Sequence, residues 1–355
     1  MNRAAKPLIT PPVSELVKTY RPTLVTGAAG FIGYHVVLRL LQLGRNVVGL
    51  DNFNDYYDPA LKRARVADLQ QRFGFRCGNV DICNEVGLEA VFESKPAVVI
   101  HLAAQAGVRF SISNPEAYVR SNVDGFFRVL EACRRFSPDH LVYASSSSVY
   151  GNESQTPFNT LMRADAPVSL YAATKRSNEL FAHTYSHLYG IPASGLRLFT
   201  VYGPWGRPDM AYFRFTRAIL RGEPIDVFNR GALSRDFTYV DDVVDAILAV
   251  AARPPLPSGS GVAGFAAPHR VLNVGRGAPT ALIDFIRQLE LLLDREAVLR
   301  MVPMQDGDVL ATYADVSALR SEFGVDPATS LSEGLSRFVD WYKSHMIEGS
   351  ESPNP

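Results

Sequence analysis

The stretch LVTGAAGFIG, residues 24–33, decides the fold of this chain. Its first apolar residues predict the end of a strand, and its three glycines, Gly27, Gly30 and Gly33, predict a tight turn. An apolar helical stripe follows and stops near Gly44. Strand, glycine turn and helix in this order are typical of a dinucleotide-binding site, because the glycines let a pyrophosphate approach the free N–H groups at the start of the helix.

A carboxylate follows at the spacing that such a site requires. The next strand candidate ends at Asp51, which can accept hydrogen bonds from ribose hydroxyls. The same negative charge repels a 2′-phosphate, so we expect NAD rather than NADP as the cofactor. Asp81 and Ile82 follow a further short strand and can border the adenine. The alternative is that the glycines only form a turn and Asp51 only caps a loop.

Short apolar runs alternate with helical patterns along the first 200 residues. This alternation predicts an α/β fold with a Rossmann-type, doubly wound parallel sheet. The expected strands lie at residues 23–26, 46–50, 97–102, 140–145 and 193–200. The expected divisions are an N-terminal extension over 1–20, an NAD-binding Rossmann domain over 21–200, a smaller, mainly substrate-binding lobe over 201–345 with segments that return to the Rossmann domain, and a tail over 346–355. Residues 253–264 are expected to form a surface loop.

Composition excludes several classes of partner. Lys and Arg together number 36, as do Asp and Glu, so no net positive field attracts nucleic acid or an anionic membrane. No run reaches the roughly 20 apolar residues of a membrane span. Cys77, Cys83 and Cys133 fit no metal spacing and no disulfide framework. We therefore expect a cytoplasmic protein without a metal site.

The spacing of Tyr171 and Lys175 suits proton transfer by a tyrosine. Their i, i+4 spacing puts a phenol and an ammonium on one helix face. A nearby cation stabilises tyrosinate and lowers the pKa of the phenol from about 10, so that it can act as a general base. The hydroxyls of residues 146–148 follow the predicted strand over 140–145, at the ligand-binding edge of the sheet. The alternative is an ordinary exposed pair on a helix.

The order of these motifs is similar to that of a known family. The glycine turn, the HLAA of residues 101–104, the serine-rich strand end and the Tyr171/Lys175 pair resemble the extended short-chain dehydrogenase/reductases, and most closely the UDP-glucuronate 4-epimerases. The similar segments are residues 51–57, 101–109, 143–151, 169–175, 183–189, 198–210 and 235–242.

The resemblance implies roles for individual residues. It assigns catalysis to Ser146, the base Tyr171 and the assisting Lys175, and a diphosphate-binding role to Arg235. In such enzymes the helices often pair into a homodimer. Together with Gly33, the residues implied to contact NAD are Gly27, Gly30, Phe31, Ile32, Asp51, Asp81, Ile82, Leu102, Ala103, Ala104, Asn122, Tyr171 and Lys175.

Two serines distinguish epimerisation from dehydration. Related nucleotide-sugar dehydratases carry an Asp-Glu pair where this chain has Ser147 and Ser148. Without paired carboxylates, water elimination lacks its acid and base, so redox exchange at C4 remains. The expected reaction removes a hydride from C4, turns the 4-keto sugar within the site, and returns the hydride to the opposite face, which regenerates NAD.

A uronic acid substrate adds a requirement, because its 4-keto form is a β-keto acid that readily loses CO₂. Charge-assisted hydrogen bonds can hold the carboxylate out of alignment with the ketone. The resemblance places Ser147, Ser148, Thr200 and Arg207 around this carboxylate. The alternative for Arg207 is a loop ion pair with Asp209.

The last expected contacts are with the nucleotide. Neutral-sugar epimerases commonly carry an arginine shortly before a Gly-Asp pair, which in this chain is residues 307–308. This chain has Gln305 at that place. Uronate epimerases tolerate glutamine there, which favours that assignment. Ile225 and Val227 are candidates to border the uracil, although apolar residues there fit ordinary packing equally well.

The leading hypothesis is therefore reversible C4 epimerisation of UDP-glucuronate to UDP-galacturonate. A neutral UDP-hexose 4-epimerase and a decarboxylating UDP-uronate enzyme are the enzymatic alternatives. A non-catalytic NAD-sensing or scaffold protein on the same fold is the alternative from a different class, and the presence of Ser146, Tyr171 and Lys175 argues against it.

Overall fold

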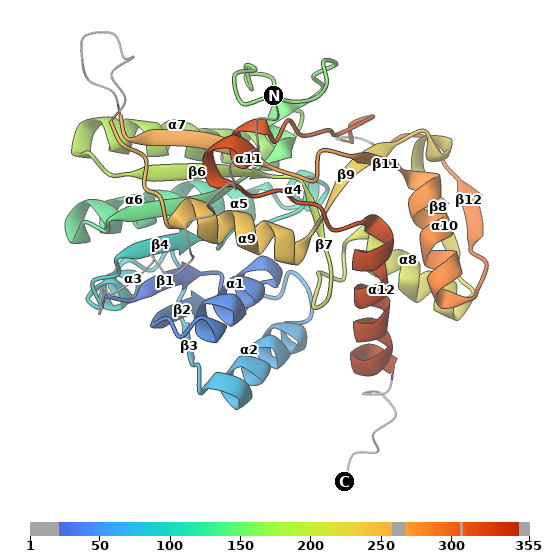
Figure 1. The fold of residues 1–355 in the computed structure, drawn as a ribbon, viewed down its shortest axis with the longest axis horizontal. Helices are drawn as coiled ribbons and strands as arrows, with labels where there is room; N and C mark the ends of the chain where they lie inside the picture. Colours follow the sequence, from blue (N-terminus) through green and yellow to red (C-terminus); the bar gives the residue numbers. More distant parts are fainter. Residues whose placement is uncertain (1–20, 258–266, 306–307, 348–355) are drawn as a thin grey trace, which may run out of the picture.

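A computed structural model describes residues 21–257, 267–305 and 308–347. Its centre is a seven-stranded sheet in the order β10-β6-β5-β4-β1-β2-β3, and all of its pairings are parallel (Figure 1). The expected extension over 1–20, most of the expected tail and part of the expected loop at 253–264 lie outside the described residues. The strands are β1 (Thr23–Thr26), β2 (Val47–Asp51), β3 (Cys77–Asn79), β4 (Val98–His101), β5 (His140–Ser146), β6 (Ala193–Leu198) and β10 (His269–Val274).

Helices cover both faces of this sheet (Figure 1). On one face α1 packs against α2 and α9, and α9 also contacts α11; on the other, α6 packs against α3 and α7. The expected doubly wound Rossmann-type fold is confirmed. These helices are α1 (Phe31–Gln42), α2 (Pro59–Phe73), α3 (Glu85–Phe92), α6 (Gly125–Phe136), α7 (Leu170–Tyr189), α9 (Val240–Ala251) and α11 (Ser317–Phe323).

The expected strand at 193–200 is two strands. β6 stays in the large sheet, whereas β7 (Thr200–Tyr202) pairs with β9 (Ser234–Tyr239), which also pairs with β11 (Pro279–Ala281). The chain changes sheets at Phe199, whose N–H still donates to Val274 O at 3.0 Å. A continuous apolar run cannot reveal such a change of pairing partner, because both halves are buried strands.

A smaller lobe lies beside the carboxyl edge of the sheet (Figure 1). Its two-stranded sheet joins β8 to β12, and its helices pack through an aromatic cluster of Phe213, Phe338 and Trp341. Between the lobe's segments, α9 and β10 rejoin the large sheet. The lobe comprises α8 (Ala211–Arg221), β8 (Pro224–Val227), the turn η4 (Phe228–Gly231), α10 (Leu282–Leu293), β12 (Val298–Met301), α12 (Leu331–Tyr342) and the π-helical η6 (Lys343–Ile347).

Short helical segments connect the carboxyl ends of β4 and β5 to the following helices. They are α4 (Phe110–Ser113), α5 (Pro115–Tyr118), η2 (Val119–Asp124) and η3 (Ser147–Tyr150). Helix α7, which carries the tyrosine–lysine pair, begins at the N-cap Ser169, whose hydroxyl accepts from Ala172 N at 3.2 Å. It ends at Gly190, which adopts the left-handed conformation that favours glycine at a helix C-terminus.

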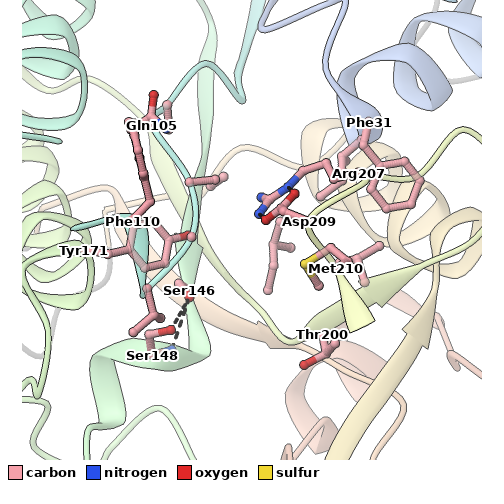
Figure 2. A pocket seen from close by; sticks show the side chains of 18 of the residues that line it. Phe31, Gln105, Phe110, Ser146, Ser148, Tyr171, Thr200, Arg207, Asp209 and Met210 are labelled. Atoms are coloured by element: carbon pink, nitrogen blue, oxygen red, sulfur yellow. Dashed lines mark hydrogen bonds and ion pairs between the residues drawn. The ribbon is translucent and has the colours of Figure 1, made fainter. Parts of the chain in front are cut away.

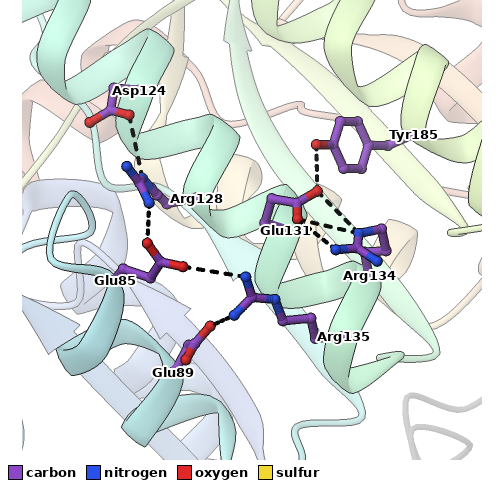
Figure 3. A network of polar contacts seen from close by, with 8 residues as sticks. All are labelled: Glu85, Glu89, Asp124, Arg128, Glu131, Arg134, Arg135 and Tyr185. Carbon is purple, nitrogen blue, oxygen red and sulfur yellow. Dashed lines mark hydrogen bonds and ion pairs between the residues drawn. The ribbon is translucent and has the colours of Figure 1, made fainter.

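Ion pairs join α3 and α6 (Figure 3). Glu85 binds both Arg128 and Arg135, and Tyr185 on α7 donates to Glu131 on α6 at 2.6 Å. Since these side chains are partly exposed, each pair adds little stability. Among the described residues, no helix is long and apolar enough to cross a membrane, and no cluster of three His, Cys, Asp or Glu is suited to a metal.

Candidate active site

A cavity of about 860 Å³ lies between the carboxyl edge of the large sheet and the smaller lobe. Its size is in the usual range for a small-molecule site. Most of the residues singled out in the sequence line it: Gly27, Gly30, Phe31, Ile32, Gly33, Asp51, Asp81, Ile82, Leu102, Ala103, Ala104, Ser146, Ser147, Ser148, Tyr171, Lys175, Thr200, Arg207, Arg235 and Asp308. Asn122, Ile225, Val227 and Gln305 do not.

The glycine turn between β1 and α1 is shaped for close approach of a ligand. Gly27 has a positive φ of 71°, and a Cβ there would lie 2.7 Å from Ala103 N. A Cβ on Gly33 would collide with Gly27 O. The first N–H groups of α1 have no partner within the helix, so they can bind an anion. The turn therefore fits the pyrophosphate of a dinucleotide.

Asp51 ends β2 at the wall of the cavity and is buried. Its carboxylate accepts from Phe53 N at 2.8 Å and from Ala29 N at 3.2 Å, and Lys62 Nζ lies 3.8 Å away. Burial lowers the pKa of Lys62, and the Asp51 charge opposes that shift. These bonds hold the carboxylate next to the glycine turn, where a ribose of the dinucleotide is expected.

Asn122 does not line the cavity in this structure, and its contact with the cofactor stays a prediction. Its buried amide donates to Gln105 O at 3.0 Å and to Thr174 Oγ1 at 3.1 Å, and its oxygen accepts from Gln105 N at 2.8 Å. Both ends of the side chain therefore bind protein atoms. Asn122 holds the segment after β4 against α7, one layer behind the cavity wall.

Ser146, Tyr171 and Lys175 come together from β5 and α7. Figure 2 shows Tyr171, Ser146 and Ser148 grouped on one side of the cavity, with Ser146 Oγ 3.1 Å from Ser148 Oγ. Lys175 Nζ donates to Ala144 O at 2.9 Å, and burial lowers the pKa of this lysine to about 8.

The expectation that Lys175 lowers the pKa of Tyr171 is not met in this structure. Burial raises the pKa of the phenol, while a hydrogen bond with Ser146 and the charge of Arg207 act in the opposite direction. Lys175 does not contribute to this shift, and its ammonium donates to the Ala144 carbonyl on β5. The two groups that favour tyrosinate in this structure are therefore the Ser146 hydroxyl and the guanidinium of Arg207, which lies on the opposite wall of the cavity.

Arg207 lies in the loop between β7 and α8, and its side chain points toward the middle of the cavity from the wall that also carries Thr200 (Figure 2). The expected alternative, an ion pair with Asp209, is present, with Nη2 2.6 Å and Nε 3.0 Å from the carboxylate. Tyr56 OH also donates to Asp209 at 3.0 Å. Burial lowers the pKa of Arg207, but attraction to Asp209 outweighs it, so the guanidinium stays charged.

Two arginines meet one carboxylate at the far end of the cavity. Arg235 Nη2 lies 2.6 Å from Asp308, and Arg109 Nη2 lies 3.7 Å from the same carboxylate. The Arg109 guanidinium also lies 4.8 Å from the centre of the Phe228 ring. Arg109 ends one of the segments that resemble the family, but the resemblance assigns it no role. Its position after β4, at the ligand-binding edge of the sheet, is the signal that could have identified it.

The residues predicted to border the uracil, Ile225 and Val227, and the predicted nucleotide contact Gln305 do not line the cavity, so these contacts stay predictions. Ile225 and Val227 are buried in the hydrophobic core, and Asp226 and Phe228 line the cavity instead. Successive side chains along a strand point to opposite faces. Asp226 faces the cavity, so Ile225 and Val227 on either side of it face the core. Gln305 lies outside the cavity wall, which Asp308 forms at that point.

A model of the NAD dependent epimerase/dehydratase family matches residues 23–261 of this sequence. With the glycine turn, the Ser146–Tyr171–Lys175 group and the Rossmann-type sheet, this match shows that the chain belongs to the NAD-dependent epimerase/dehydratase family. The expected cofactor, NAD, and the expected class of enzyme, an isomerase, are confirmed.

The similar proteins include several with the same printed activity. The chain is 48% identical to UDP-glucuronate 4-epimerase 3 of Arabidopsis thaliana, over 93% of this chain and 78% of that one. It is 46% identical to a probable UDP-glucuronate 4-epimerase of Rhizobium meliloti, over 90% and 96%. The UDP-glucuronic acid 4-epimerase of Bacillus cereus, solved with UDP-glucuronic acid and NAD, is 34% identical, with a TM-score of 0.82 over 91% of this chain and 99% of that one.

Proposed function

We propose that this chain catalyses the reversible C4 epimerisation of UDP-glucuronate to UDP-galacturonate. The observation that carries the proposal is the placement of Arg207 across one cavity from Tyr171 and Ser146 (Figure 2). A proton-transfer group and a cation for a sugar carboxylate then face the same space. The curated relatives named as UDP-glucuronate 4-epimerases support the same substrate.

Tyr171 is the proposed acid–base group. Its oxygen takes the proton of the C4 hydroxyl as the ketone forms and returns it after the sugar has turned. Ser146 donates a hydrogen bond to the reacting oxygen, and Lys175 assists from the same cavity, where we assign its ammonium to the bound cofactor. Bound NAD accepts a hydride from C4 and gives it back to the opposite face of the sugar.

The carboxylate of the sugar requires separate restraint. We assign this role to Arg207, Thr200, Ser147 and Ser148, which line the same cavity. Charge-assisted hydrogen bonds from a planar guanidinium fix the orientation of a carboxylate, so its C–C bond stays out of alignment with the C4 ketone π-system. CO₂ is then retained, which is what separates an epimerase from a decarboxylase of the same substrate.

The nucleotide diphosphate is assigned to Arg235 and Arg109. Both arginines line the end of the cavity and bind Asp308 in the present structure. A diphosphate carries more negative charge than one carboxylate, so it can replace Asp308 as the partner of either guanidinium. Arg109 is thereby added to the residues expected from the sequence.

Product analysis tests the proposed reaction. Purified protein incubated with UDP-glucuronate is expected to yield UDP-galacturonate, resolved by chromatography, with no pentose product. Tyr171→Phe, which keeps the ring but loses the proton, is expected to reduce kcat by at least about a hundredfold. Wild-type protein that forms no UDP-galacturonate contradicts the proposal.

Arg207→Ala separates the acid sugar from the neutral one. We expect the variant to lose activity toward UDP-glucuronate, and any activity with UDP-glucose to remain unchanged, since the neutral sugar has no carboxylate for Arg207. A neutral UDP-hexose 4-epimerase predicts the reverse preference in the wild type. Formation of a UDP-pentose would instead identify a decarboxylating enzyme.

We also propose that the chain forms a homodimer in the cytoplasm. Phe127 on α6 and Leu180 and Leu188 on α7 are large apolar side chains that are exposed on neighbouring helices. Such a patch favours association with a second copy. Light scattering after gel filtration is expected to give twice the chain mass, and Leu180→Glu is expected to give one chain mass.

A further inference from the structure

Arg65 on α2 is a charged side chain that the proposed chemistry does not use. It is completely buried, with an exposed fraction of 0%. Its five donor contacts go to neutral oxygens: twice to Trp205 O (2.6 and 3.1 Å), and once each to Gly206 O (3.2 Å), Ala29 O (3.0 Å) and Tyr57 OH (2.7 Å). Burying a guanidinium is costly unless hydrogen bonds replace its hydration, so this complete set of acceptors is a specific arrangement.

These acceptors belong to three segments that form the cavity. Ala29 lies in the glycine turn of the cofactor site, and Tyr57 lies in the loop after β2. Trp205 and Gly206 immediately precede Arg207, the residue assigned to the sugar carboxylate. One guanidinium therefore ties the backbone of the substrate loop to the backbone of the cofactor turn.

The conformation of the substrate loop depends on such a restraint. Trp205 has a φ of +58°, which is unfavourable for a large side chain and persists only where surrounding contacts impose it. Its ring packs against Trp341, with ring centres 5.3 Å apart, and its carbonyl receives two bonds from Arg65. α12 therefore holds the ring of Trp205 and α2 holds its carbonyl, two residues before Arg207.

We propose that Arg65 is a positioning residue that sets the preference for an acidic sugar by fixing the loop of residues 203–209. This inference rests on the proposed role of Arg207. Placement of a charged partner to within about 1 Å decides most of its contribution to recognition. A lysine at position 65 keeps the charge but has three donors on one atom, so it cannot reproduce a fork that reaches three segments.

Arg65→Lys tests the proposal, with Arg72→Lys as the matched control. Arg72 lies on the same helix, and its side chain is exposed and paired with Asp68. Calorimetric titration of NAD-loaded protein gives the Kd of UDP-glucuronate and of UDP-glucose, and their ratio measures the preference. We expect Arg65→Lys to reduce this preference about tenfold, the effect of one charge-assisted hydrogen bond, and Arg72→Lys to leave it unchanged.

A double-mutant comparison shows whether Arg65 acts through Arg207. In an Arg207→Ala background, Arg65→Lys is expected to cause no further loss of preference. Equal weakening of both sugars by Arg65→Lys, or an additive loss in both backgrounds, overturns the proposal. If Arg207→Ala alone leaves the preference unchanged, the proposed carboxylate site itself is wrong, and the role of Arg65 falls with it.

Tyr57→Phe provides the test if Arg65→Lys does not fold. It removes one acceptor of Arg65 and introduces no charge. The expected result is a smaller loss of preference, about threefold, in the range of one neutral hydrogen bond. An unchanged ratio in this variant, with a normal melting temperature, overturns the proposal.

Discussion

At the scale of single residues, the site depends on positions where one atom more or less changes the chemistry. Gly27 and Gly44 make a matched pair, because both have positive φ values, of 71° and 68°. A Cβ at Gly27 meets the backbone of Ala103, whereas a Cβ at Gly44 meets nothing within 4 Å. The backbone strain of an alanine is thus the same at both positions, and the steric collision is specific to Gly27.

Gly27→Ala is therefore expected to abolish NAD retention, while Gly44→Ala is not. Both variants lose about 1–2 kcal/mol of unfolding free energy from the left-handed conformation. Only Gly27→Ala also displaces the Ala103 segment from the cofactor turn. Absorbance of the nucleotide released from each purified variant measures the difference. Equal NAD content in the two variants would show that the turn does not bind the pyrophosphate.

The buried ammonium of Lys175 leads us to expect that activity depends on pH. Burial disfavours the ammonium and lowers its pKa from 10.5 to about 8, so the charge is present below that pH and is lost as pH rises through it. We expect kcat/KM for UDP-glucuronate to fall above about pH 8. Lys175→Met should have low activity with no such fall. A flat wild-type profile from pH 7 to pH 10 would contradict this assignment.

At the scale of elements, a buried ion pair joins α7 to β6 behind the catalytic group, and a hydrogen bond from Ser145 adds β5 to it. Glu179 lies two turns after Tyr171 and accepts from Arg197 Nε and Nη2, both at 2.8 Å, and from Ser145 Oγ at 2.6 Å. Hydrogen bonds and the Arg197 charge lower the pKa of Glu179 against the opposing effect of burial. This network ties the end of β5, next to Ser146, to the helix that carries Tyr171.

Glu179→Gln is expected to destabilise the protein by about 3 kcal/mol, because it leaves the Arg197 charge buried without a counter-charge. Glu333→Gln, in an exposed pair with Arg337, is the control and is expected to change little. Urea unfolding at pH 7 measures both. Because the pKa of Glu179 is lowered in the fold, its contribution is present at pH 7 and is lost as pH falls through that value. Equal stability of the two variants would contradict the network's role.

The elements also show which parts of the structure could be predicted. β1, α1 and β2 follow from glycines and apolar runs that are local in the sequence, and the structure has them where expected. The exit of β7 into a second sheet was missed, because pairing partners are set by distant segments such as β9. The same limit explains Ile225 and Val227, since the face of a strand that meets a cavity depends on what packs against it.

At the scale of the whole molecule, the cavity forms where the domain of the large sheet meets the smaller lobe. Gly27 and Tyr171 come from the large domain, whereas Phe228 and Arg235 come from segments beyond β7. α9 and β10, from the same later part of the chain, rejoin the large sheet. This return tethers the lobe at several points, so a ligand that contacts both walls stabilises the folded molecule as a whole.

NAD is therefore expected to raise the melting temperature of nucleotide-stripped protein by several degrees. A ligand at roughly a thousand times its Kd adds about 4 kcal/mol of unfolding free energy. NADP is the control, since Asp51 repels the 2′-phosphate, and we expect it to give a much smaller shift. Thermal scans with each nucleotide at equal concentration measure this. Equal shifts would show that Asp51 does not select the cofactor.

The sequence by itself determined the Rossmann-type fold and the choice of NAD, and it predicted the group of Ser146, Tyr171 and Lys175 that lines one cavity in the structure. Each of these follows from residues close together in the chain, where turn geometry and helix periodicity limit the possible arrangements. Tertiary structure alone decided that Arg109 faces the same carboxylate as Arg235, that Asn122 binds Gln105 and Thr174, and that Arg65 connects the cofactor turn to the Arg207 loop. Those relations join segments up to 199 positions apart (Arg109 to Asp308), and only packing in three dimensions brings their side chains together.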